Sequence, residues 1–173
     1  FQQAFDRVLE IEQKMSSSTE DYANTEILEV NRSAADGPVE VSPDTFHVIQ
    51  RGLEFSRVSN GAFDITVSPL VQLWGIGTDS AGVPDESEIA QVLPLIGYEM
   101  VALDADRTAV VIEREGMGID VGGIAKGYAA AEAARILRDR GVDHALLDFG
   151  GNILTVGRKP DGFRAVHAME ELK

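Results

Sequence analysis

The feature that most constrains this chain is a pair of glycines between an apolar segment and a long helical one. Residues 116–121 are apolar enough for a short strand, and Gly122 and Gly123 follow directly. The alanine-rich stretch 124–140 predicts the strongest helix in the sequence, and Gly141 ends it. The first free N–H groups of this helix would point at the glycines, where the backbone can approach a ligand. The pattern therefore predicts a strand, a tight turn and a helix, with room for an anion.

Two charged residues lie beside this turn. Lys126 falls in the first turn of the predicted helix, where a cation opposes the helix dipole, so a phosphate partner explains it better than stability does. Asp120 could hold a hydroxyl or an amide of the same ligand. The turn is neither a P-loop, which needs Ser or Thr after Gly-Lys, nor a dinucleotide fingerprint, whose third glycine is displaced here. A structural turn and a ligand-binding turn both remain open.

Capping signals and apolar periodicity predict the remaining elements. The expected helices cover residues 1–15, a short stretch capped by Asn24 or Thr25 and closed by Asn31, a helix that starts at Ser42-Pro43-Asp44, and a short one between Asp85 and Pro94. The expected strands are 99–103 and 108–113, which form a hairpin, and 144–149 and 153–156. This mixture predicts an α+β fold, with helices packed on a mainly antiparallel sheet.

Length, charge and cysteine content limit the domain number, the partners and the chemistry that this chain can have. A chain of 173 residues with 44% hydrophobic content is expected to form one domain, residues 1–173. The net charge of −14 disfavours nucleic acid or an anionic membrane surface as a partner. Zero cysteine excludes disulfides and thiolate chemistry. The chain starts at Phe1 without an initiator Met and stops soon after a predicted strand, so we expect a fragment of a longer domain.

A second informative segment is Asn60–Gly77. Asp64 stands alone in an apolar stretch, with Thr66 two residues later, so its charge needs either nearby donors or a ligand. A loop-anchoring carboxylate and a ligand contact both remain open. Trp74 is interpreted as a core residue rather than a platform for a ligand ring.

Together the two segments resemble the signature of the FAD:protein FMN transferases, the ApbE family. Residues 61–71 resemble the family's Gly-Ala-Phe-Asp-Pro-Thr-Val-Gly-Pro-Leu-Val, with Ile65 for Pro and Ser68 for Gly. Residues 120–129 are similar to its Asp-Leu-Gly-Gly-Ile-Ala-Lys-Gly-Tyr-Ala. Residues 25–31 and 150–153 resemble two shorter family segments, so the resemblance covers nearly the whole chain.

The resemblance implies a T-fold-related fold and a magnesium-dependent transfer of FMN from FAD to a Thr or Ser hydroxyl of an acceptor flavoprotein, which releases AMP. It assigns FAD contacts to six residues: Tyr22, Ala62, Phe63, Asp64, Asp120 and Lys126. It also assigns a magnesium ligand to the position of Gly123, which can offer only its backbone carbonyl. No catalytic residue is assigned. The resemblance further implies an extracytoplasmic location, often with a lipid anchor at the membrane.

One departure from the family affects the metal. The family completes its magnesium site with Asp and Thr side chains near its C-terminus, and residues 163–173 do not resemble that segment. We therefore expect this chain alone to transfer FMN poorly, because one carbonyl does not hold magnesium against water. An alternative function is a non-catalytic module that binds FAD or another nucleotide without a complete metal site.

Overall fold

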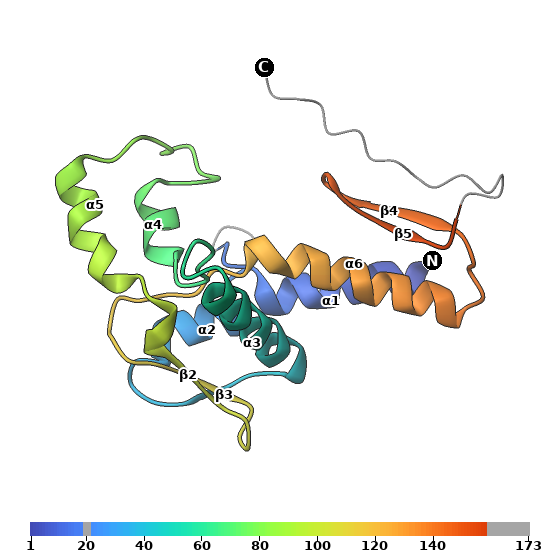
Figure 1. Ribbon diagram of the computed structural model, residues 1–173, viewed down its shortest axis with the longest axis horizontal. Helices are drawn as coiled ribbons and strands as arrows, with labels where there is room; N and C mark the ends of the chain where they lie inside the picture. Colours follow the sequence, from blue (N-terminus) through green and yellow to red (C-terminus); the bar gives the residue numbers. More distant parts are fainter. Residues whose placement is uncertain (19–21, 159–173) are drawn as a thin grey trace. The chain divides into compact units, whose positions relative to one another are not determined.

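A computed structural model describes residues 1–18 and 22–158 of the chain, and Figure 1 shows its helices and strands. The chain divides into two compact units, one of residues 13–124 and one that combines residues 1–12 with the segment from 125 onward. The prediction of a single domain over 1–173 stays a prediction. The expectation about the tail, 163–173, lies outside the described residues.

The described residues of the larger unit hold α2 (Glu26–Ser33), α3 (Pro43–Val58), α4 (Ser68–Leu73) and α5 (Glu86–Val92). The starts of α2, α3 and α5 follow the predicted capping signals, whereas α4 was not predicted and has no side-chain cap. Thr25 caps α2 by accepting a hydrogen bond from the Leu28 N–H at 3.0 Å, and α2 continues two residues past Asn31. Ser42 caps α3, and Asp85 forms the predicted capping box with Glu88. Local sequence signals therefore start α2, α3 and α5.

The sheet of the larger unit is antiparallel, with strand order β1-β3-β2. It contains β2 (Val101–Asp104) and β3 (Ala109–Ile112), which confirm the predicted hairpin in a shorter form. Short 3₁₀ turns occupy Leu93–Leu95 and Tyr98–Met100, the second on residues predicted as strand. The third strand, β1 (Val39–Glu40), is only two residues long and gave no sequence signal. Buried aliphatic side chains from α2, α3 and β3 belong to the core of this unit, among them Ile27, Ile49, Leu53 and Val110.

The prediction of a strand over 116–121 is wrong. In the described structure Gly116 lies in a turn, and the segment makes one parallel β-bridge, between Val67 and Gly118, without a ladder. The backbone of this segment forms its hydrogen bonds outside a sheet. The Asp120 N–H donates to the Ile65 carbonyl at 2.8 Å, and the Asn31 side chain bonds both the N–H and the carbonyl of Ile119. A side chain takes the place that a neighbouring strand would have.

The smaller unit contains the first part of α1 (Gln2–Met15), most of α6 (Gly122–Asp139) and the antiparallel pair β4 (Ala145–Phe149) and β5 (Asn152–Val156). Its core joins Ala4 of α1 with Ala133 and Leu137 of α6. The Glu132 carboxylate accepts hydrogen bonds from Arg135 and Arg7. These hydrogen bonds, that from Arg135 first, hold the pKa of Glu132 below its usual range. None of the described helices is long and apolar enough to cross a membrane.

Candidate functional site

The two segments singled out in the sequence lie side by side in the larger unit. The hydrogen bond from the Asp120 N–H to the Ile65 carbonyl and the Val67–Gly118 bridge join them. At their ends, the Phe63 ring lies directly over Gly123, because a Cβ added to Gly123 would be 3.0 Å from Phe63 Cε2. That separation is shorter than an ordinary carbon contact, so this close approach favours glycine at position 123.

Asp120 holds the start of α6. Its Oδ1 accepts a hydrogen bond from the Gly122 N–H at 2.7 Å, and its Oδ2 accepts one from the Ser17 hydroxyl at 2.9 Å. A carboxylate at this place satisfies one of the free N–H groups of the helix and favours its positive end. Asp120 therefore has a structural role in the turn, and each oxygen keeps a further lone pair for a ligand.

Asp64 anchors a loop. Its Oδ1 accepts from the Thr66 N–H at 2.8 Å and from the Thr66 hydroxyl at 2.7 Å. Its Oδ2 accepts from the Tyr98 N–H at 3.0 Å, and Thr66 Oγ1 accepts from the Gly97 N–H at 2.8 Å. This network confirms the loop-anchoring interpretation of Asp64. A flavin contact by the same residue stays a prediction.

Next to the anchor, the Tyr98 phenol lies beside a carboxylate. Its hydrogen bond with Glu99 raises the pKa of Tyr98, with desolvation adding to the shift. The phenol therefore stays protonated at neutral pH and acts at this site as a neutral hydrogen-bonding group.

A mostly apolar groove of about 390 Å³ lies beside Phe63 and Gly123. Phe55 and Val58 of α3, the following Ser59 and Ile124 also line it. Phe55 and Phe63 meet edge to face, with ring centroids 6.5 Å apart. The Arg51 guanidinium lies 5.2 Å from the centre of the Phe55 ring, so a cation stacks on the groove's outer aromatic residue. A lining of this kind suits a flat aromatic ligand.

The remaining predicted site residues are less enclosed. Ala62 is exposed in the turn before Phe63, and Tyr22 is half-buried in the segment before α2. Lys126 is exposed on α6, in the part of that helix that belongs to the smaller unit. The interpretation of Trp74 as a core residue is wrong, because its exposure is 37% at the end of α4. The following turn folds back, with the Gly82 N–H bonded to the Trp74 carbonyl, and does not cover the ring.

Sequence reasoning did not assign a site role to Asn31, Ser17 or Tyr98. Ser17 and Asn31 bond directly to the Asp120 segment, and Tyr98 bonds to Asp64. The partners are separated by 103, 88 and 34 positions in the chain, so no local pattern connects them. The one available signal was the polar end of the segment 25–31, which resembles a family segment.

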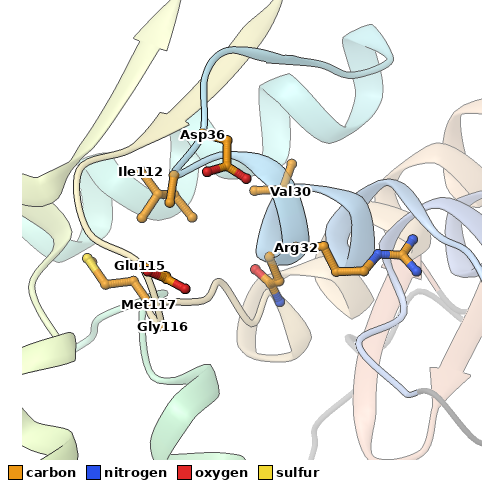
Figure 2. Close-up of a pocket in the computed structure, with 9 residues that line it drawn as sticks. Val30, Arg32, Asp36, Ile112, Glu115, Gly116 and Met117 are labelled. Atoms are coloured by element: carbon orange, nitrogen blue, oxygen red, sulfur yellow. The ribbon is translucent and has the colours of Figure 1, made fainter.

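A second, smaller hollow of about 120 Å³ lies between α2 and the segment that follows β3. Figure 2 shows Asp36 and Glu115 around it and Arg32 extending away from both. The Arg32 guanidinium instead bonds Asn24 and Glu29. This hollow is lined neither by Gly123 nor by any of the six predicted FAD-contacting residues. It is therefore separate from the site at Phe63.

The fit of magnesium can be tested on the residues themselves. Among the described residues, no group of three or more His, Asp or Glu side chains could hold a metal ion. The two carboxylate oxygens of Asp120 and the Gly123 carbonyl offer at most three oxygens, whereas magnesium prefers an octahedral set of six. The described residues alone therefore do not make a magnesium site.

The fold and the site define an α+β protein in which a helix-starting glycine turn adjoins an apolar groove. The sequence model of the ApbE family matches residues 1–167. The chain therefore belongs to the ApbE family.

Curated relatives carry the name FAD:protein FMN transferase. One from Klebsiella pneumoniae (strain 342) is 36% identical over 84% of this chain and 46% of its own length. One from Treponema pallidum (strain Nichols) is 31% identical over 96% of this chain and 47% of its own length. The chain thus spans about half the length of the curated relatives it matches.

Solved structures confirm the fold. A mutant form of the flavin transferase ApbE from Vibrio cholerae superposes with a TM-score of 0.86 at 28% identity, covering 98% of this chain and 57% of that one. The ApbE protein from Thermotoga maritima gives 0.81 at 30% identity, with 91% and 52% covered. The predicted combination of helices with antiparallel sheet is therefore that of this family.

Proposed function

We propose that this protein takes part in the magnesium-dependent transfer of FMN from FAD to a Thr or Ser hydroxyl of an acceptor flavoprotein, with release of AMP. Family membership supports flavin transfer, since the relatives are named FAD:protein FMN transferases. The observation that carries the proposal is the contact of Phe63 with Gly123 beside the apolar groove. It joins a surface for a flat ring to the start of a helix.

In the proposed site, the groove between Phe55 and Phe63 holds a flat ring of FAD, and Asp64 fixes the loop that carries Phe63. The pyrophosphate lies toward the N-terminus of α6, where free N–H groups and the helix dipole favour negative charge. The family resemblance also assigns an FAD contact to Lys126, in the first turns of that helix.

The proposed reaction exchanges one P–O bond for another. The acceptor hydroxyl oxygen bonds to the FMN phosphorus, the bond from that phosphorus to the bridging oxygen breaks, and AMP leaves with the bridging oxygen. The hydroxyl proton passes to solvent or to a base that we do not assign. Such a transfer depends mainly on positioning and on neutralising phosphate charge. The described residues do not complete a magnesium site.

The site also fits the alternative, a non-catalytic FAD-binding module. Both oxygens of Asp64 and both oxygens of Asp120 already accept hydrogen bonds within the protein. These carboxylates thus hold the loop and the turn, a role that a binding module needs as much as an enzyme does. Release of AMP from FAD separates the two functions.

The test measures FAD binding by isothermal titration calorimetry and AMP release by chromatography, with and without magnesium and an acceptor peptide. Lys126→Ala should weaken FAD binding about tenfold or more, since a hydrogen bond to a charged group contributes about 1.5–3 kcal/mol. Arg138→Ala is the matched control, because it removes the same charge from the last turn of α6. Binding without AMP release supports the module, and no FAD binding overturns both functions.

We also propose an extracytoplasmic location with a lipid anchor, which rests on the family resemblance. Fractionation of the native host checks it, with release of the protein into the cytosolic fraction as the contradicting result.

A further inference from the structure

Asn31, in the last turns of α2, makes a two-point contact that the proposed function does not use. Its Nδ2 donates a hydrogen bond to the Ile119 carbonyl at 2.9 Å, and its Oδ1 accepts one from the Ile119 N–H at 2.6 Å. One side-chain amide thus satisfies both backbone groups of one residue. A neighbouring strand would offer the same donor and acceptor to an edge residue.

Ile119 depends on these bonds. Its side chain is fully buried, and unpaired backbone groups in such surroundings are costly. On the opposite side, the Asp120 N–H bonds the Ile65 carbonyl and Gly118 pairs with Val67. Residues 118–120 therefore lie between the loop 65–67 and the Asn31 amide, in the place where a sheet would otherwise continue.

On the side of residue 118, Asn31 is also closely packed, although its other side faces the 120 Å³ hollow. A Cβ added to Gly118 would lie 3.3 Å from Asn31 Cγ and 3.1 Å from Ser68 Cβ. The amide is consequently held against the segment by packing as well as by its two hydrogen bonds. Only an asparagine side chain has the required length together with one donor and one acceptor, because aspartate lacks the donor and glutamine is one methylene longer.

We infer that Asn31 is a positioning residue for the glycine turn: it holds Ile119, and through it sets the place of the Asp120 carboxylate at the start of α6. Asp120 follows Ile119 directly, and its two carboxylate contacts, to the Gly122 N–H and to Ser17, depend on where its backbone lies. The effect of Asn31 on FAD rests on the proposed function, since Asn31 itself is not a contact residue in that site.

The experiment compares wild type with Asn31→Ala and Asn31→Asp in the full 173-residue chain. The Asp variant keeps the acceptor for the Ile119 N–H and loses the donor to the Ile119 carbonyl. Val30→Ala is the control, because Val30 is the fully buried neighbour of Asn31 in α2. Its truncation destabilises the same helix and leaves the amide contact intact.

Two measurements follow on each folded variant. Amide NMR reports hydrogen exchange at Ile119 and the chemical shift of the Gly122 N–H, which reads the Asp120 contact. Titration with FAD in the presence of MgCl₂ reports affinity. We expect both Asn31 variants to shift the Gly122 signal, and to weaken FAD binding about tenfold or more, as removal of an orienting partner commonly does. Val30→Ala should leave both readings at the wild-type values.

Unchanged Gly122 and FAD readings in a folded Asn31 variant would overturn the inference. So would the same changes in Val30→Ala, because they would show general destabilisation. Failure of both Asn31 variants to fold while Val30→Ala folds also counts against a local positioning role. If wild type itself binds no FAD, the proposed function fails, and the Gly122 and Ile119 amides alone decide the role of Asn31.

Discussion

At the scale of single residues, Asp64 shows how one side chain can hold a site together. Asp64→Asn keeps an acceptor for Thr66 but turns an NH₂ group toward the Tyr98 N–H, which then faces a donor. We expect a loss of about 1 kcal/mol in the free energy of unfolding, because the group left unsatisfied is partly buried. Urea unfolding followed by circular dichroism measures it.

Asp104→Asn is the matched control for Asp64. Asp104 also accepts two hydrogen bonds, from the N–H groups of Asp106 and Arg107, but both reach the same oxygen. The amide oxygen of Asn can keep both, so this variant should stay within about 0.5 kcal/mol of wild type. Equal stability of the two variants would contradict the anchoring role of Asp64.

The sequence could not decide between an anchor and a ligand contact at Asp64. Thr66 was visible as a partner because it lies two positions away, whereas the Tyr98 N–H lies 34 positions away. The candidate site was predictable where one motif contains both partners, as at Asp120 and Gly122. It was not predictable where a tertiary contact supplies the second partner, as at Asn31 and Ser17.

At the scale of elements, the apolar residues of α1 differ widely in their exposure. Ile11 is 2% exposed, whereas Phe5 on the same helix is 65% exposed. Ile11→Ala should therefore cost about 2–5 kcal/mol of stability, and Phe5→Ala should stay within about 0.5 kcal/mol. Chemical denaturation of the two variants measures both. Equal losses would show that the Phe5 face of α1 is covered by protein.

The starts of α2, α3 and α5 were predictable because capping is local, whereas α4 has no side-chain cap and was not predicted. Each signal lies within a few positions, Ser42 next to Pro43 and Asp85 three residues before Glu88. The structure confirms both helix starts. The strand expected over 116–121 failed for the opposite reason. Apolar composition could not reveal that an asparagine from α2 would pair with this backbone instead of a strand. The two-residue strand β1 is too short for any periodic signal.

At the scale of the whole molecule, the net charge of −14 is the dominant electrostatic property. Like charges repel over distances set by the ionic strength, and this repulsion disfavours the compact state. The specific ion pairs, such as Lys14 with Asp44 at 2.9 Å and Arg7 with Glu132 at 3.1 Å, act over much shorter distances. Salt should therefore weaken the long-range repulsion more than it weakens these pairs.

From this balance we expect added NaCl to stabilise the chain at pH 7. Raising the ionic strength from about 10 mM to about 150 mM shortens the Debye length from about 30 Å to about 8 Å. A gain near 1 kcal/mol would raise Tm by roughly 2–4 °C for a chain of this size. Thermal unfolding followed by circular dichroism measures it. The same titration at pH 4.5, where the net charge is near zero, is the control and should show little change. A fall in Tm with salt at pH 7 would mean that the ion pairs outweigh the repulsion.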